Sequence, residues 1–144
     1  MHHNIEILIA EDDDGHALLI KKNLKRAGVI NKIRRFKDGQ EILDFLFKNK
    51  KDITANSNAS YVLLLDINMP KKNGVDVLKQ IKKDEKFQKL PVIMLTTTDN
   101  PVEIDECYRL GCNNYIAKPV DYDKFIETIK KLGLFLMIVK TPQI

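Results

Sequence analysis

Acidic side chains follow two apolar runs of the chain. Glu11, Asp12 and Asp13 stand together directly after one run, and Asp66 comes directly after another. Carboxylates that lie close together repel one another and raise each other's pKa values. A hard divalent cation relieves this repulsion, and Mg²⁺ prefers oxygen ligands while keeping several waters. The pattern therefore favours a divalent metal site if the ends of the two runs meet.

A hydroxyl and an ammonium group follow two further apolar runs. Thr96 closes the run 91–96, and Lys118 follows the run 114–117, directly before Pro119. A carboxylate beside a bound cation can act as a nucleophile toward phosphorus. The cation and a lysine can together neutralise charge on the transferring phosphoryl oxygens, and a hydroxyl can donate a hydrogen bond to the acyl phosphate. These residue types together indicate phosphoryl transfer to a carboxylate.

Each of these residues also has a plainer explanation. The four consecutive acids from Glu11 to Asp14 suit the positive end of a helix dipole, and Asp66 could cap a turn or a helix. Thr96 could be a β-former at a strand end, and Lys118 could be a surface lysine ahead of a turn proline. Four separate coincidences explain the pattern less well than one shared site, so we expect the side chains to converge.

Four short apolar runs and one weaker, more charged segment, residues 31–36, alternate with helical patterns along the chain. The predicted strands cover residues 5–10, 31–36, 61–66, 91–96 and 114–117. Such alternation predicts an α/β fold with a five-stranded parallel sheet and helices on both of its faces. The carboxyl ends of parallel strands meet at one edge of the sheet, where ligands bind in folds of this kind. This edge would bring the acids, the hydroxyl and the ammonium together.

A polar segment, KNKKDITANSNAS, occupies residues 48–60 between the second predicted helix and the third strand. It has almost no apolar side chains. Segments of this composition are typical of loops, so we expect a long surface loop here.

Four segments of the chain resemble the receiver domains of two-component response regulators, the CheY-like family. They are Glu11-Asp12-Asp13, the run DINMPKKNG that begins at Asp66, Thr96-Thr97, and the run YIAKP that begins at Tyr115. Their order and spacing match that family over roughly residues 5–132. The resemblance implies a flavodoxin-like, doubly wound (βα)5 fold with strand order 2-1-3-4-5. Residues 1–144 would then form a single receiver domain.

The resemblance also implies how the acidic residues act. Asp66 would be the phosphoacceptor. Mg²⁺ or Mn²⁺ would be bound by Asp12 and Asp66, by Glu11 mostly through water, and by the backbone carbonyl of Asn68.

Three further roles follow from the same resemblance. Thr96 would be the switch hydroxyl that moves toward the phosphate. Lys118 would pair with the phosphate, across a cis peptide bond to Pro119. Tyr115 would be the aromatic side chain that turns inward on activation.

These roles describe a signalling phosphoacceptor and not an enzyme that turns over a metabolite. We expect a single-domain response regulator that accepts a phosphoryl group from a sensor histidine kinase. The polar insertion and the long last helix more weakly resemble the regulators paired with phytochrome-type kinases. Two alternatives stay open, a receiver-like scaffold that works without phosphorylation and an Mg²⁺-dependent aspartyl phosphatase. If the chain were such a scaffold, one of the site residues should be missing. If it were such a phosphatase, the nucleophile should follow the first strand and a cap domain should be present.

The amino-acid composition bears on whether the protein binds nucleic acid or a membrane. The 144 residues include 24 basic and 20 acidic side chains, for a net charge of +4, and the lysines are scattered or paired. A solvated surface explains this pattern, so we expect no nucleic acid partner. No apolar run approaches the roughly 20 residues that span a bilayer, and the N-terminus lacks the apolar stretch of a signal peptide. We therefore expect a cytoplasmic protein with no membrane partner.

The cysteines and histidines do not form a recognisable site in the sequence. Cys107 and Cys112 lack the spacing of a zinc site, so reduced thiols are expected. His2, His3 and His16 have no matched partners in the sequence, and we expect no metal or catalytic role for them.

The last predicted helix runs from about residue 121 to 139. Its core stripe would contain Phe125, Ile129, Leu132 and Leu136. Further apolar side chains, among them Phe135, Met137 and Ile138, fall outside this stripe, which is unexpected on the surface of a monomer. We expect homodimerisation through this helix, and the alternative is that the tail folds back over its own domain.

Overall fold

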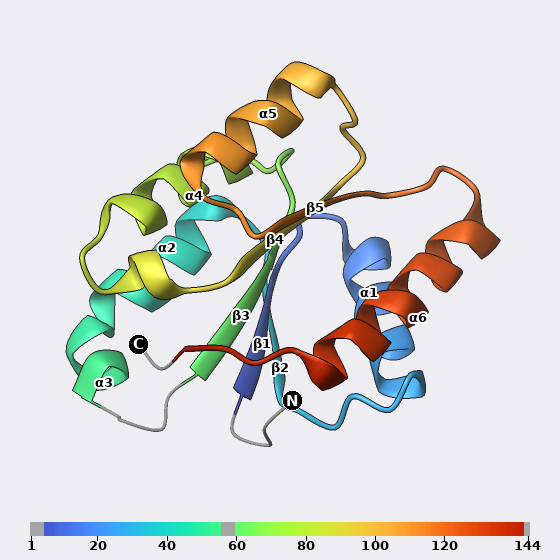
Figure 1. The fold of residues 1–144 in the computed structure, drawn as a ribbon, viewed down its shortest axis with the longest axis horizontal. Coiled ribbons are helices and arrows are strands. Elements are labelled where there is room, and N and C mark those ends of the chain that lie inside the picture. The colour runs from blue at the N-terminus through green and yellow to red at the C-terminus, as the bar shows by residue number, and fades with distance from the viewer. Residues whose placement is uncertain (1–4, 56–59, 143–144) are drawn as a thin grey trace.

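A five-stranded parallel sheet forms the centre of the computed structural model, which describes residues 5–55 and 60–142 (Figure 1). Its strands are β1 (Ile5–Ala10), β2 (Ile33–Phe36), β3 (Ser60–Leu65), β4 (Val92–Thr96) and β5 (Asn114–Ala117). They lie in the order β2-β1-β3-β4-β5, and every neighbouring pair is parallel. The α/β class and the strand order are therefore confirmed.

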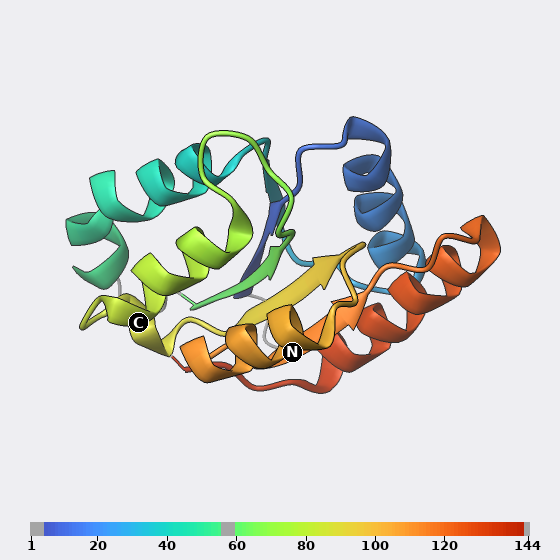
Figure 2. The same cartoon turned by 90° about the horizontal axis from the view of Figure 1, so that it is seen from above.

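Helices cover both faces of the sheet (Figures 1 and 2). They are α1 (Asp14–Arg26), α2 (Gly39–Lys48), α3 (Lys50–Ala55), α4 (Gly74–Lys83), α5 (Pro101–Leu110) and α6 (Tyr122–Ile138), with a short 3₁₀ turn at Phe87–Lys89. The helices α1 and α6 lie side by side on one face, and α2, α4 and α5 cover the other. In the part of the chain that the structure describes, no helix is long and apolar enough to cross a membrane.

The alternation of side chains along each strand explains these two layers. In β1, Ile7 and Ile9 pack with α1 and α6, whereas Leu8 and Ala10 pack with α2 and α4. Because both faces are covered, the inner strands are apolar throughout. The edge strand β2 is only half-buried and contains Arg35.

The prediction of one long loop over residues 48–60 is wrong. Lys50–Ala55 forms the helix α3, and residues 56–59 lie outside the described residues. Ile53 is buried against the core, and Lys50 forms an ion pair with Asp84, whose carboxylate oxygen lies 2.6 Å away. One apolar side chain and an ion pair with a residue far along the chain stabilise this helix. The local sequence pattern therefore gave little indication of a helix.

Candidate functional site

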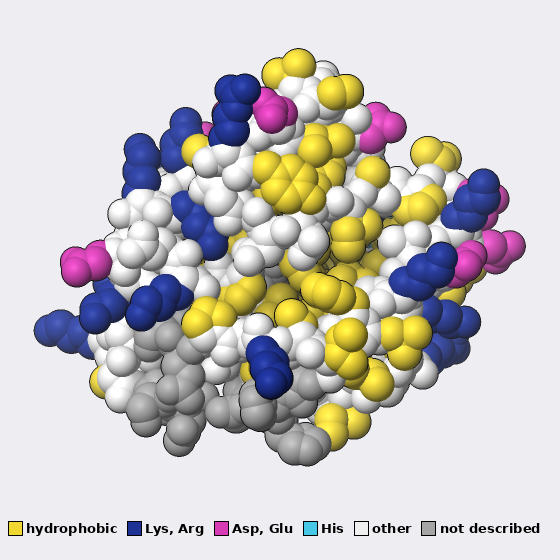
Figure 3. Space-filling view, in the orientation of Figure 1, with side chains coloured by type: hydrophobic (Ala, Val, Ile, Leu, Met, Phe, Trp, Pro, Cys, Tyr) yellow, Lys and Arg dark blue, Asp and Glu magenta, His cyan; other side chains and the backbone are white. Residues whose placement is uncertain are grey.

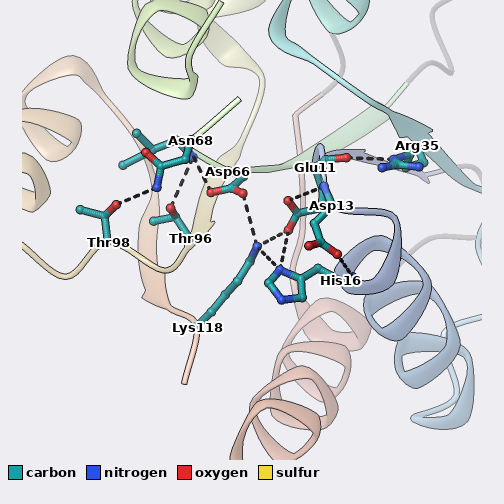
Figure 4. A network of polar contacts seen from close by, with 10 residues as sticks. Glu11, Asp13, His16, Arg35, Asp66, Asn68, Thr96, Thr98 and Lys118 are labelled. Atoms are coloured by element: carbon teal, nitrogen blue, oxygen red, sulfur yellow. Dashed lines mark hydrogen bonds and ion pairs between the residues drawn. The ribbon is translucent and has the colours of Figure 1, made fainter. Parts of the chain in front are cut away.

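The carboxyl ends of four strands bring the candidate residues to one edge of the sheet (Figure 4). Glu11 directly follows β1, Asp66 directly follows β3, Thr96 is the last residue of β4, and Lys118 directly follows β5. Figure 4 shows Lys118 reaching from its strand toward both Asp66 and Glu11. Residues separated by about 100 positions in the chain therefore meet, as the parallel alternation predicted.

The loop after β3 has the sequence that its geometry requires. Asn73 caps α4, because its side chain accepts a hydrogen bond from the backbone N–H of Asp76 at 3.0 Å. Gly74 begins the helix so close to β3 that an added Cβ atom would lie 2.1 Å from the carbonyl oxygen of Asp66. Glycine is the residue that allows this approach. The Asn-Gly pair thus anchors the loop that contains Asp66 and Asn68.

Three carboxylates form a cluster that could hold a cation. Oxygen atoms of Glu11, Asp12 and Asp66 all lie within 4.8 Å of one another. Glu11 and Asp66 are buried, whereas Asp12 is exposed. An all-oxygen cluster that is open to water on one side suits a hard cation such as Mg²⁺, which keeps some of its waters.

The ammonium group of Lys118 lies on the inner side of this cluster. It forms ion pairs with Glu11 and with Asp66, whose Oδ2 atom is 3.4 Å away. The Lys118 side chain is 2% exposed. A buried charge of this kind is stable only when it is paired, so the acids and the lysine depend on each other.

Burial and ion pairing shift the pKa values of Glu11 and Asp66 in opposite directions. Burial raises the pKa of Glu11 to about 8, the hydrogen bond with Asp66 raises it too, and Lys118 opposes this rise. Burial alone would also raise the pKa of Asp66, but hydrogen bonds with Glu11 and Thr96 and the charge of Lys118 hold it below 3.8. Of the two buried carboxyls, Asp66 is therefore the stronger acid.

A second chain of contacts leads from this site toward β5. The Asn68 side-chain amide donates a hydrogen bond to the hydroxyl of Thr98 at 3.2 Å. The hydroxyl of Tyr115 donates to the backbone carbonyl of Thr98 at 2.6 Å. Tyr115 is half-buried, and burial raises its pKa. Thr98, which the sequence did not single out, therefore joins the loop after β3 to Tyr115.

Arg35 is another neighbour of the site that the sequence did not single out. Its Nε atom donates to the backbone carbonyl of Glu11 at 2.9 Å (Figure 4). Its Nη1 atom donates to the carboxylate of Asp14 at 2.7 Å. It projects from the edge strand β2 and links the first strand end to the start of α1. The only sequence feature that could have indicated a role for Arg35 was the charged character of its strand.

Two expectations about individual residues need correction. The peptide bond between Lys118 and Pro119 is trans, as are all other peptide bonds of the described residues, so the expected cis bond is absent. His16 was expected to lack partners, yet its Nδ1 atom lies 3.2 Å from Nζ of Lys118 and 3.6 Å from a Glu11 oxygen. His2 and His3 lie outside the described residues.

The chain is similar to known proteins over most of its length. Residues 7–130 match the family model of the response regulator receiver domain. A solved response regulator receiver domain from Rhodospirillum rubrum is 44% identical, with a TM-score of 0.90 and coverage of 96% of this chain and 97% of that one.

Two further similar proteins are also response regulators. Response regulator Rcp1 of Synechocystis is 32% identical over 129 residues, which are 90% of this chain and 86% of Rcp1. A solved Mn²⁺-bound Rcp1 superposes at 27% identity with a TM-score of 0.82, covering 95% of this chain and 98% of that one.

The third similar protein is the phosphorylated cyanobacterial phytochrome response regulator RcpA. It is 30% identical, with a TM-score of 0.85 and coverage of 98% of this chain and 99% of that one. Three observations indicate the same family. They are the order of the strands in the sheet, the acidic cluster at its carboxyl edge and the family match over residues 7–130. The chain therefore belongs to the response regulator receiver domain family of two-component signalling.

Proposed function

We propose that residues 1–144 act as a single receiver domain that accepts a phosphoryl group on Asp66 from a sensor histidine kinase. The observation that carries the proposal is the buried carboxylate of Asp66, which lies beside both a lysine ammonium and two further acids. A carboxylate that stays ionised near neutral pH is available as a nucleophile.

The chain's own residues provide the rest of the transfer step. One Asp66 oxygen forms a bond to phosphorus, while the bond from phosphorus to the donor's nitrogen breaks and its electron pair leaves with the donor. Lys118 neutralises charge on the transferred group, and the Thr96 hydroxyl, which is fully buried beside Asp66, donates a hydrogen bond to the product.

A divalent cation fits the acidic cluster. Glu11, Asp12, Asp66 and the backbone carbonyl of Asn68 would bind Mg²⁺ or Mn²⁺, which would neutralise charge on the phosphoryl oxygens. The exposed carboxylate of Asp12 makes it the main ligand that a hydrated cation could reach. The similar protein Rcp1 has a Mn²⁺-bound form, which supports the binding of a divalent cation.

The signal then passes to protein contacts through Thr96 and Tyr115. Thr96 Oγ1 lies 3.5 Å from the backbone N of Ile67, directly after Asp66. Thr98 lies between the Asn68 side chain and the Tyr115 hydroxyl. Movement of Thr96 toward a phosphoryl group would therefore shift the loop after β4 and, with it, the hydrogen bond of Tyr115.

A kinase of the phytochrome type is the partner that the similar proteins favour. RcpA is a cyanobacterial phytochrome response regulator, and this chain covers 99% of its structure at 30% identity. The likeness extends through the long last helix, so it is not confined to the phosphorylation site.

Incubation with acetyl phosphate and Mg²⁺, followed by intact mass spectrometry, tests the phosphoacceptor. The native protein should gain one phosphate, and D66N should gain none. The matched control is D76N, because Asp76 is exposed in the first turn of α4 and should leave the adduct unchanged. A native protein without an adduct would contradict the proposal and favour the scaffold alternative.

We also propose that two copies of the chain associate through α6. Figure 3 shows apolar side chains gathered on the face that α6 and β5 share. Leu134, Phe135, Met137 and Ile138 are exposed on this helix, and Phe135 lines a cavity of about 320 Å³ beside Ile116. A second copy of the same surface would cover these side chains.

Light scattering at several concentrations tests this association. I138E should weaken dimerisation by roughly tenfold or more, since it adds a charge to a contact core. V102E is the matched control, because Val102 has a similar exposure, 76% against 78%, and lies in the first turn of α5 on the opposite face of the sheet. A protein that stays monomeric at every concentration would rule the dimer out.

A further inference from the structure

The ammonium group of Lys118 has three N–H donors, and three acceptors surround it. They are a carboxylate oxygen of Glu11, Oδ2 of Asp66 at 3.4 Å and Nδ1 of His16 at 3.2 Å (Figure 4). Since the side chain is almost fully buried, each donor needs a partner inside the protein. His16 is therefore the third partner of a buried cation, and the only one of the three without a carboxylate.

An acceptor role for His16 in this contact requires the neutral form of its ring. Two cations 3.2 Å apart would repel each other strongly. The contact instead fits a neutral imidazole whose Nδ1 atom carries no proton and accepts a hydrogen bond from Lys118. Nε2 then carries the ring proton.

Two elements hold the His16 ring in this position. Asp13 caps α1 by accepting a hydrogen bond from the backbone N–H of His16 at 2.8 Å, which fixes the first turn of the helix. The ring packs against Phe125 of α6, with ring centroids 5.5 Å apart. The imidazole is thus braced from behind by the last helix while Nδ1 faces the site.

We propose that His16 is a positioning residue that holds the Lys118 ammonium in place during phosphoryl transfer. This inference rests on the proposed phosphorylation of Asp66. Asp66 would become part of the acyl phosphate and Glu11 would be one of the residues that hold a cation, so both carboxylate partners of Lys118 have another role in the reaction. His16 has neither role, so it can keep its hydrogen bond while the ammonium transfers its other donors to the phosphoryl oxygens.

Two substitutions separate the hydrogen bond from the packing. H16L keeps an apolar contact with Phe125 but has no acceptor. H16N places an amide oxygen near the position of Nδ1 and should restore the acceptor. With acetyl phosphate at saturating Mg²⁺, H16L should phosphorylate about tenfold more slowly, the scale of one lost hydrogen bond to a charged group, and H16N within about threefold of the native rate.

Two further measurements show whether the effect acts through Lys118. The side-chain ammonium signal of Lys118 in ¹H–¹⁵N spectra, assigned by its loss in K118M, should shift or disappear in H16L and persist in H16N. Mn²⁺ affinity, measured by EPR, should change less than twofold in both, because His16 is not among the clustered acids.

The outcomes distinguish this inference from the proposed function. An H16L protein with the native ammonium signal and the native phosphorylation rate would overturn the positioning role, even though the native protein is phosphorylated. A native protein that is never phosphorylated would instead contradict the proposed function, whatever the ammonium signal shows. Equal slowing in H16L and H16N would also overturn the inference, because it would assign the effect to ring packing.

Discussion

At the scale of single residues, the site keeps two acids buried and one exposed. Glu11 and Asp66 both form ion pairs with Lys118 in the interior, so part of their charge is balanced without a cation. Asp12 is exposed and has oxygen within 4.8 Å of both. The negative charge of Asp12 repels the two buried carboxylates, and a bound cation would offset this repulsion.

The substitution D12N tests this division of roles. Without a divalent cation, D12N should unfold at the same or a higher urea concentration than the native protein, because one repelling charge is removed. With Mg²⁺ at about a hundred times its dissociation constant, the native protein should gain about 2.7 kcal/mol of unfolding free energy. D12N should gain about 1.4 kcal/mol or less under the same conditions, since its affinity should fall by roughly tenfold or more.

A D76N variant is the matched control for the loss of one acidic charge, because Asp76 is also exposed but lies outside the cluster. Equal Mg²⁺ stabilisation of D12N and the native protein would refute the assignment of Asp12 as the main ligand.

At the scale of elements, α1 and α6 approach closely on one face of the sheet. Gly133 of α6 faces Ala27, and a Cβ atom added to the glycine would lie 2.7 Å from the Ala27 Cβ atom. Two helices pack at this distance only when one of them has no side chain at the crossing. Since α6 also holds Phe125 against His16, this contact helps to fix the site.

G133A should therefore lower the unfolding free energy by about 1–3 kcal/mol, because it overpacks the helix interface. Urea denaturation measures the change. The double variant A27G/G133A moves the small side chain to the other helix and should recover most of the loss. If the double variant is no more stable than G133A, the close approach of the two helices is not the cause.

The helix α3 depends on an ion pair with a distant loop. Asp84 pairs with Lys50, and its carboxylate also accepts hydrogen bonds from the backbone N–H groups of Lys86 and Phe87. Burial alone would raise the pKa of Asp84, but the bond to Lys50 and these N–H groups lower it below 3.8. The ionised carboxylate thus stabilises the fold above pH 3.8, and this contribution is lost as the pH falls through the lowered value.

D84N should lower the unfolding free energy by about 1 kcal/mol near neutral pH, since the amide oxygen can still cap the turn but no longer pairs with Lys50. The deficit relative to the native protein should shrink below pH 3.8 as the native Asp84 gains its proton. Urea titrations between pH 7 and pH 3 measure this trend. A deficit that stays constant, or grows, toward low pH would contradict the ion pair's role.

At the scale of the whole molecule, two core layers enclose the sheet, and the cysteines lie in one of them. Cys107 and Cys112 both belong to the layer beneath α2, α4 and α5. Burial raises the pKa of the Cys107 thiol to about 12. The reactive thiolate is therefore scarce, and reagents reach it only when this layer opens.

We expect both thiols to react with a water-soluble disulfide reagent at least a hundredfold more slowly in the native protein than in urea, on the order that local opening allows. If the thiols become exposed only when the whole domain unfolds, the destabilised G133A variant should react faster than the native protein. Fast reaction of either thiol in the native protein would show that the layer is open at that position.

The sequence by itself determined the α/β class, the strand positions and the residues at the carboxyl edge. These features depend on patterns within a few residues: apolar runs, helix caps and the residue that ends each strand. Asp66 and Lys118 could be assigned to one edge because parallel strands must end on the same side.

Only the tertiary structure decided which side chains complete the site. His16 reaches Lys118 across 102 positions of the chain because α1 packs against α6, and Arg35 reaches Glu11 because β2 pairs with β1. The helix α3 likewise depends on Lys50 meeting Asp84. Such contacts depend on how elements pack, which a local pattern of residue types does not encode.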